Sequence, residues 1–177
     1  DLVRSRGLGD VYKRQLKDCI LWTEKRKGIE KMSMNNNVNI DKKETAASAE
    51  KIDKIVICDD DKDIVRALQI YLSNRNYELL CAYTGREALD FVKKGDVSLV
   101  LLDIMMPEMD GVTALKELRK IEDITVPVIA VTADAIAGSE EKYLEEGFTD
   151  YISKPFTKDQ IEEKLRKILE KNNVEIL

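Results

Sequence analysis

From Ile52 onward, two patterns of hydrophobic residues alternate along the chain. One consists of short, mostly apolar runs, which are typical of strands that are buried on both faces of a sheet. Five such strands are predicted, at residues 54–58, 77–82, 97–102, 127–131 and 151–152.

The segments between these runs have apolar residues three and four positions apart, which is the spacing of helices with one buried side. Helices are predicted at residues 63–74, 86–94, 111–121 and 139–146, and a fifth follows the capping box Thr157-x-x-Gln160, with Ile161, Leu165, Ile168 and Leu169 on its apolar side. Because strands that are apolar throughout need cover on both faces, this alternation predicts an α/β fold, a doubly wound five-stranded parallel sheet with flanking helices.

The first 51 residues lack this periodicity. Their second part is rich in Asn, Lys, Ala and Ser, which favours disorder, so we expect a disordered leader at 1–51, a domain at 52–172 and a tail at 173–177. The hexapeptide DVYKRQ looks like a translated adapter from DNA library preparation, and residues 1–15 are therefore interpreted as a sequencing artefact. A genuine basic N-terminal arm is the alternative.

Charge and composition exclude several classes of function. The formal net charge of −5 argues against the positive surface that non-specific nucleic-acid binding requires. No apolar run approaches the ~18 residues of a membrane span, and none resembles a secretory signal, so a cytoplasmic protein is expected. The absence of histidine excludes Ser-His-Asp and Cys-His catalysis and histidine-based zinc sites. Cys58 and Cys81 lie in apolar runs and are expected to be buried, reduced thiols.

Polar residues stand directly after four of the five predicted strands. Asp59, Asp60 and Asp61 follow the first strand, Asp103 the third, Thr132 the fourth, and Lys154 with Pro155 the fifth. In open parallel sheets, ligands bind outside the carboxyl ends of the strands, near a switch in strand order. We therefore expect acids, a hydroxyl and an ammonium group to meet at one edge of the sheet. The simpler interpretation of Asp61 or Asp63 is a helix N-cap, and Lys154 by itself reads as a solvated lysine.

Asp103 is the hardest of these residues to explain as a turn residue. It interrupts the run LVLLDIMMPEMDG at residues 99–111, and Met105 and Met106 are expected to shield it from the other side. A carboxylate in apolar surroundings requires compensating positive charge, and Lys154 supplies one charge against three acids. A divalent cation would restore the balance, and oxygen ligands without sulfur or imidazole suit Mg²⁺.

Three other motifs that would explain the acids or bind phosphate are missing. The spacing Asp59-x-Asp61-x-Asp63 begins like an EF-hand loop, but Ile64 and Ile70 stand where that loop requires glycine and glutamate. Neither GxxxxGK[ST] nor GxGxxG occurs, which argues against an ATPase or a dinucleotide enzyme.

At this point the chain resembles a known family. It is similar to the receiver domain of bacterial two-component response regulators in four motifs: Asp59-Asp60, Asp103 within LLDIMMPEMDG, Thr132-Ala133, and Lys154-Pro155 within DYISKPF. The resemblance covers about residues 53–171, and the motifs follow in the family's order, each at a predicted strand end. It implies a flavodoxin-like or CheY-like (βα)5 fold.

The resemblance implies that Asp103 is the phosphoacceptor. Asp60, Asp103 and the backbone carbonyl of Met105 would bind Mg²⁺ directly, and Asp59 would contribute through a water molecule. Because Met105 offers no polar group to orient a water, slow self-dephosphorylation is expected.

The resemblance also implies which groups hold the phosphate. Lys154, the Thr132 hydroxyl and the Ala133 backbone N–H would bind its oxygens. Thr132 and Tyr151 would act as the switch residues, although Tyr151 has the alternative of simple packing at the sheet edge. A cis peptide is expected between Lys154 and Pro155.

The expected partners follow from the same resemblance. The phosphodonor would be a histidine kinase or a histidine phosphotransfer domain, since this chain has no histidine. The face made by the fourth helix, fifth strand and fifth helix would change its preference for a downstream protein partner. The resemblance also implies a homodimer through this face. The protein would be a signalling switch rather than an enzyme, with no direct nucleic-acid binding and no membrane contact.

Three other interpretations compete with a self-contained switch. The chain can be a fragment of a larger regulator, a DNA-binding transcription factor or a hybrid sensor kinase, without its output domain. Residues 54–95 resemble receivers of DNA-binding regulators and residues 126–171 receivers of hybrid sensor kinases, which is also what a chimeric sequence joined within LLDIMMPEMDG would give. A Mg²⁺-dependent aspartyl-phosphate phosphatase is disfavoured because Met105 occupies the place of its general acid. A purely structural receiver-like module is disfavoured because the phosphoacceptor, its lysine and its hydroxyl occur together.

Overall fold

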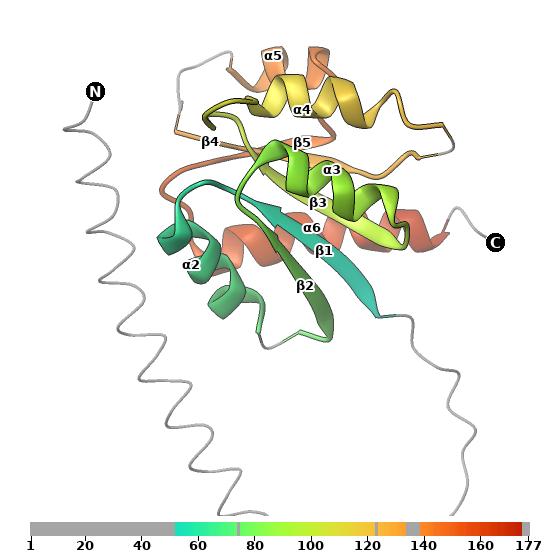
Figure 1. Ribbon diagram of the computed structural model, residues 1–177. Coiled ribbons are helices and arrows are strands. Elements are labelled where there is room, and N and C mark those ends of the chain that lie inside the picture. Colours follow the sequence, from blue (N-terminus) through green and yellow to red (C-terminus); the bar gives the residue numbers. More distant parts are fainter. Residues whose placement is uncertain (1–51, 74, 123, 134–138, 175–177) are drawn as a thin grey trace, which may run out of the picture.

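The computed structural model describes residues 52–73, 75–122, 124–133 and 139–174, so the predicted leader at 1–51 lies outside the described residues. Within these ranges, five parallel strands form one sheet in the order β2-β1-β3-β4-β5 (Figure 1). The strands are β1 (Asp53–Cys58), β2 (Tyr77–Ala82), β3 (Val97–Asp103), β4 (Val128–Thr132) and β5 (Asp150–Ser153). The predicted fold class is confirmed, and the strand order switches between β1 and β3.

Helices cover both faces of the sheet (Figure 1). They are α2 (Lys62–Leu72), α3 (Gly85–Lys93), α4 (Gly111–Leu118), α5 (Ser139–Glu145) and α6 (Lys158–Val174). Helices α2 and α6 pack on one face, and α3, α4 and α5 pack on the other. The predicted domain end at residue 172 stays a prediction, with α6 extending to Val174.

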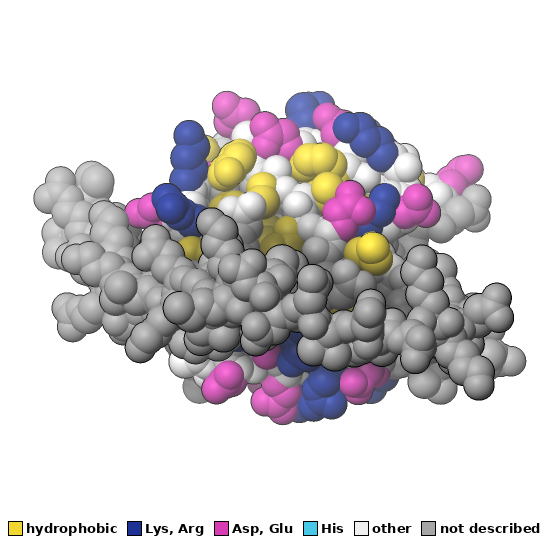
Figure 2. Space-filling view, turned by 90° about the horizontal axis from the view of Figure 1, so that it is seen from below, with side chains coloured by type: hydrophobic (Ala, Val, Ile, Leu, Met, Phe, Trp, Pro, Cys, Tyr) yellow, Lys and Arg dark blue, Asp and Glu magenta, His cyan; other side chains and the backbone are white. Residues whose placement is uncertain are grey.

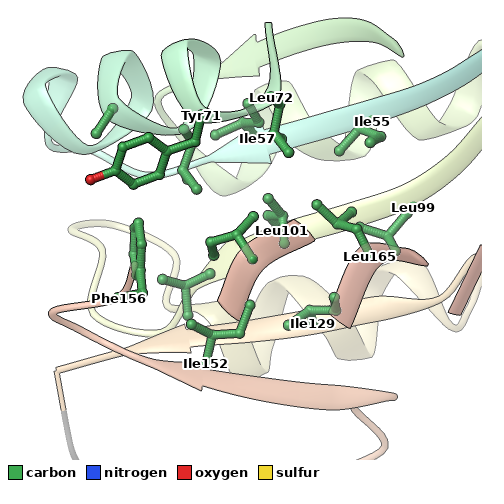
Figure 3. Packing of buried hydrophobic residues seen from close by; sticks show 14 of the residues in the cluster. Ile55, Ile57, Tyr71, Leu72, Leu99, Leu101, Ile129, Ile152, Phe156 and Leu165 are labelled. Carbon is green, nitrogen blue, oxygen red and sulfur yellow. The ribbon is translucent and has the colours of Figure 1, made fainter. Parts of the chain in front are cut away.

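The face under α2 and α6 holds the first of two cores, called here the α2–α6 core (Figure 3). Its strand residues are Ile55, Ile57, Leu99, Leu101, Ile129, Val131 and Ile152. Helix α2 adds Leu68 and Tyr71, and α6 adds Leu165. The ring of Tyr71 meets that of Phe156 edge to face, with centroids 6.4 Å apart, which joins α2 to the segment before α6.

The opposite face holds the second core, called here the α3–α5 core. Its strand residues are Val56, Cys58, Ala82, Val100, Leu102, Val128 and Ala130, and its helical residues include Leu89, Leu115, Leu118 and Tyr143. Alternate residues of the central strands therefore enter opposite cores, as the two-residue period of a strand requires.

Local hydrogen bonds explain where the helices begin. Asp61 caps α2 by accepting from the Asp63 N–H at 2.8 Å, which is the simpler role predicted for it. Thr84 caps α3, and Asp110 caps α4 by accepting from the Thr113 N–H. The predicted capping box before α6 is confirmed: the Thr157 N–H donates to the Gln160 side chain at 2.8 Å, and the Gln160 N–H donates to the Thr157 hydroxyl at 3.3 Å.

The largest boundary error concerns α4, which was predicted to reach Ile121 and ends at Leu118. The next turn is held by bonds of the tighter three-residue kind, from Lys120 N–H to Glu117 O and from Ile121 N–H to Leu118 O, both at 3.2 Å. Apolar spacing does not distinguish this turn from a continued α-helix.

The cysteine prediction was correct for one residue of the two. Both described cysteines are free, and Cys58 is buried, but Cys81 is only half-buried. The reason is that β2 is an edge strand, so one flank of it has no neighbouring strand.

Figure 2 shows one face of the molecule, where acidic and basic side chains are interspersed rather than gathered by sign. Among the described residues, no helix has the length and apolar character needed to cross a membrane.

Candidate functional site

The strand ends deliver their polar residues to one edge of the sheet through backbone bonds that continue past the strands. The Asp59 N–H donates to Ala82 O at 3.2 Å, and the Lys154 N–H donates to Thr132 O at 2.6 Å. Asp103 is the last residue of β3, and the next N–H, of Ile104, donates to Val131 O at 3.0 Å. The predicted convergence of acids, hydroxyl and lysine is therefore built on rigid backbone.

A buried lysine joins two buried acids at the centre of the site. Lys154 Nζ lies 2.6 Å from Asp59 Oδ2 and 2.9 Å from Asp103 Oδ1. Asp59 and Asp103 are each 2% exposed. Charge-assisted bonds of this length fix the ammonium group between the two carboxylates.

A third acid borders this pair. Side-chain oxygens of Asp59, Asp60 and Asp103 lie within 4.8 Å of one another, and Asp60 is exposed. Asp61, by contrast, turns away to cap α2, while its N–H donates to Asp59 Oδ1 at 2.9 Å. Three of the four acids predicted near the site thus face one another.

The environment of the acids disfavours their charge. Burial raises the pKa of Asp59 to about 7; Lys154 opposes this rise, and the charge of Asp103 adds to it. Burial likewise raises the pKa of Asp103, although Lys154 opposes the rise. For Lys154, burial lowers the pKa, but the charges of both acids and their hydrogen bonds outweigh it, so its pKa is raised. One ammonium therefore does not satisfy the acids that surround it.

This donor set fits a hard divalent cation. Asp59, Asp60 and Asp103 offer oxygen ligands close together, without sulfur or imidazole, and their uncompensated negative charge would be lowered by a bound ion. The fourth predicted ligand, the backbone carbonyl of Met105, belongs to the loop that follows β3.

The prediction that the Met105 side chain shields Asp103 was wrong. Met105 is 74% exposed, whereas Met106 is buried with its Sδ 3.6 Å from Cys58 Sγ. Ile104 and Met106 of this loop belong to the α3–α5 core, and Met105 does not. Asp103 is buried by the fold around it rather than by Met105.

Gly111 holds the loop after Asp103 in place, a role that the sequence pattern did not reveal. Its N–H donates to Ile104 O at 3.0 Å, and a β-carbon added to it would collide with the backbone oxygen of Asp103 and lie 2.9 Å from Ile104 Cα. Glycine at the start of α4 thus lets the helix begin directly against the backbone of Asp103.

The remaining predicted residues lie around this centre. Thr132 ends β4 and is buried, and Ala133 after it is exposed. The peptide bond between Lys154 and Pro155 is cis. Tyr151 in β5 is half-buried, with Lys164 Nζ 5.3 Å from its ring centre.

Tyr143 is a second residue near the site that the sequence analysis missed. Its hydroxyl lies 3.1 Å from Thr132 Oγ1, and both residues are buried. In the sequence it reads as an ordinary apolar-face residue of α5, and no motif distinguishes it.

Comparisons with known proteins agree with this geometry. The sequence model of the response regulator receiver domain matches residues 55–166. A probable transcriptional regulator, ycf27 of Porphyridium aerugineum, is 40% identical over 117 residues, which are 66% of this chain and 48% of that protein. The chain thus spans about half the length of this curated relative.

Solved structures show the same fold. The receiver domain of the Francisella response regulator 1452 has 29% sequence identity and a TM-score of 0.63, over 68% of this chain and 98% of that one. The Vibrio cholerae chemotaxis protein CheY4, with 24% identity and a TM-score of 0.61 over 66% of this chain and 98% of its own, supports the fold alone. With the family match over residues 55–166, these findings establish that the chain belongs to the response regulator receiver domain family of two-component systems.

Proposed function

We propose that this domain accepts a phosphoryl group on Asp103 and thereby changes its contacts with other proteins. The observation that carries the proposal is the buried Lys154 ammonium, shared between Asp59 and Asp103 at hydrogen-bond distance. One acid is enough to pair with one lysine in a structural salt bridge, whereas surplus acid beside the lysine can hold a metal ion that assists phosphoryl transfer.

In the proposed reaction, an oxygen of the Asp103 carboxylate attacks the phosphorus of a phosphohistidine on a partner protein. The P–N bond breaks, and its electron pair stays on the imidazole nitrogen of the donor. Asp59, Asp60, Asp103 and the Met105 carbonyl would hold Mg²⁺, which would supply positive charge against the phosphoryl oxygens. Nucleophile alignment and charge neutralisation are the two requirements of phosphoryl transfer.

The residues of this chain would then hold the product. Lys154 would pair with one phosphoryl oxygen, and the Thr132 hydroxyl and Ala133 N–H would donate to the others. Once Thr132 engages the phosphate, it and Tyr151 would alter the face formed by α5, β5 and α6. Helix α5 carries an exposed apolar side chain, Leu144, and Tyr151 of β5 is half-buried.

The proposed partners are a histidine kinase or histidine phosphotransfer domain as donor, and a downstream protein or a second copy of this chain on the α5–β5–α6 face. The domain would act in the cytoplasm as a switch rather than as an enzyme with a substrate of its own. The exposed Met105 side chain has no proton to donate to a leaving group, which speaks against the phosphatase alternative.

A second candidate is that the domain regulates a longer transcription factor. It is supported by the ycf27 relative, which is a probable transcriptional regulator about twice as long as its match to this chain. The phosphoacceptor chemistry would be the same, and nucleic-acid binding would belong to residues outside this domain.

Intact mass spectrometry after incubation with acetyl phosphate and Mg²⁺ tests the proposal. The wild type should gain about 80 daltons, one phosphoryl group, and Asp103→Asn should gain nothing. Asp110→Asn is the matched control: it changes an exposed acid of the same loop to a residue that caps helices equally well, and should be phosphorylated normally. A wild type that stays unmodified, or an adduct that persists in Asp103→Asn, would refute the proposed role.

A further inference from the structure

The hydroxyl pair of Thr132 and Tyr143 is a buried polar contact at the end of β4. Thr132 is 1% exposed and Tyr143 is 4% exposed, with 3.1 Å between Oγ1 and the phenol oxygen. Tyr143 is itself well anchored in α5, since its ring meets that of Phe148 edge to face and its carbonyl accepts from the Phe148 N–H at 3.1 Å. The pair therefore links the site to α5 through a fixed ring.

The register of the strands places this contact on the side of the sheet opposite to Asp103. Leu99, Leu101, Ile129 and Val131 enter the α2–α6 core, and Val100, Leu102, Val128 and Ala130 enter the α3–α5 core. By this alternation, Thr132 belongs to the α3–α5 side, where Tyr143 lies, and Asp103 belongs to the other side.

The placement of Thr132 and Asp103 on opposite sides of the sheet then sets a constraint on the hydroxyl. A threonine hydroxyl has one proton to donate, and phosphoryl oxygens only accept. For Thr132 to donate to a phosphate on Asp103, its hydroxyl must turn from the α3–α5 side toward the phosphoacceptor. A tyrosine hydroxyl that loses its partner inside the core is costly unless its surroundings move.

We propose that Tyr143 is a positioning residue that holds the Thr132 hydroxyl in the unphosphorylated arrangement and couples its release to movement of α5. This inference rests on the proposed phosphoacceptor role of Asp103. Because the hydroxyl pair stabilises the unphosphorylated form alone, removing the phenol oxygen makes the phosphorylated arrangement easier to reach. Helix α5 belongs to the face proposed for partner binding, so the same contact carries the signal outward.

Titration with beryllium trifluoride, a mimic of the phosphoryl group, in the presence of Mg²⁺ tests this coupling. Tyr143→Phe keeps the ring packing and removes one hydrogen bond, so it should bind the mimic about three- to tenfold more tightly than the wild type. In a Thr132→Val background the same change should have no effect, because the partner hydroxyl is already gone. Tyr71→Phe, at a buried tyrosine of the α2–α6 core, is the matched control and should bind like the wild type.

The outcomes separate this inference from the proposed function. A wild type that neither binds the mimic nor forms the mass adduct contradicts the proposed function itself. A wild type that binds, together with a Tyr143→Phe protein of equal or weaker affinity, overturns the coupling and leaves the phosphoacceptor role intact. The same gain in the Thr132→Val background also overturns it.

A measurement on the wild type covers the case in which Tyr143→Phe does not fold. The NMR signal of the Tyr143 ring should shift when the mimic binds, because its hydroxyl exchanges partners, whereas the Tyr71 ring signal should stay in place. A Tyr143 signal that does not move would contradict the coupling.

Discussion

At the scale of single residues, the feature that matters most is that few positive groups compensate the charge of the acids at the site. Lys154 is the one cation that the described residues place between Asp59 and Asp103, and burial keeps the pKa of both carboxyl groups raised. A site built for stability alone would match its charges or replace them with apolar residues. The excess acid is instead suited to a ligand that brings positive charge.

The Met105 side chain leads to a prediction about the lifetime of the phosphorylated form. It is 74% exposed and lies two residues after Asp103, with no polar group to direct a water molecule toward an acyl phosphate. We expect Met105→Asn to shorten the half-life of the adduct several-fold, and Met105→Leu to leave it unchanged, as followed by intact mass after the donor is removed. A wild-type half-life of seconds, or equal half-lives in all three proteins, would contradict this role.

The sequence was sufficient to find the residues that carry charge at the site, but not those that position them. Asp59, Asp103 and Lys154 stand out because a charge directly after an apolar strand is unusual. Gly111 and Tyr143 do not stand out, because a close backbone approach and a single hydroxyl contact depend on where two distant segments meet. The exposure of Met105 was missed for the same reason, because the pattern of apolar residues in a loop does not show which of them face the core.

At the scale of elements, hydrophobic period predicted each described strand and helix. The C-terminal ends of all five strands were predicted to within one residue. Strand β4 starts one residue later than predicted because Pro127 has no N–H to donate, although its carbonyl accepts from the Val100 N–H at 3.0 Å. Helix ends were less certain where the chain continues in a tighter turn, as after α4. The hydrophobic period therefore identifies a strand or helix reliably but does not locate the last turn of a helix.

Helix α6 depends on its apolar side for its place against the sheet. Leu165 is fully buried in the α2–α6 core (Figure 3). Leu165→Ala should lower the free energy of unfolding by about 2–5 kcal/mol, because it removes buried methyl groups and leaves a cavity. Urea unfolding followed by circular dichroism measures this change.

The neighbouring Arg166→Ala is the control for that experiment. Arg166 is exposed and pairs with Glu170 across one helical turn, so its loss should change the free energy of unfolding by less than about 0.5 kcal/mol. Equal losses in the two variants would mean that α6 is not held by the α2–α6 core.

At the scale of the whole molecule, the two cores are separated by the sheet, and the site lies at the edge where the sheet ends. The buried apolar residues that stabilise the fold therefore lie in the two cores, and the unfavourable interactions between acids lie at one edge of the sheet. Stability of the whole domain should therefore respond to the state of a few acids, which gives the site a measurable effect on global unfolding.

The expected effect is a loss of stability as the pH rises in the absence of metal. The pKa of Asp59 is raised from 3.8 to about 7 in the folded protein, so the folded state binds more protons than the unfolded state between these values. The free energy of unfolding of the protein should then fall as the pH increases from about 4 to 7. Asp103, whose pKa is also raised by burial, should add to this loss of stability. Urea unfolding at several pH values with a chelator present measures the slope.

Two variants identify the source of that slope. Asp59→Asn should make the slope shallower, since one of the two titrating groups is gone. Added Mg²⁺ should recover stability for the wild type at the higher pH. Asp96→Asn, at an exposed turn residue with a φ of 62° that asparagine also adopts, should leave the slope unchanged. A wild type whose stability is flat or rises over this range would refute the assignment.

The alternation of β3 and β4 between the two cores has an evolutionary consequence. Successive residues of a strand enter opposite cores, so the position of Asp103 along β3 decides on which side of the sheet its carboxylate lies. Substitutions within a strand change packing by degrees, but a one-residue insertion or deletion upstream of Asp103 in β3 would exchange every inward and outward neighbour at once. Length variation among descendants of this gene should therefore accumulate in the connections and be absent from the central strands.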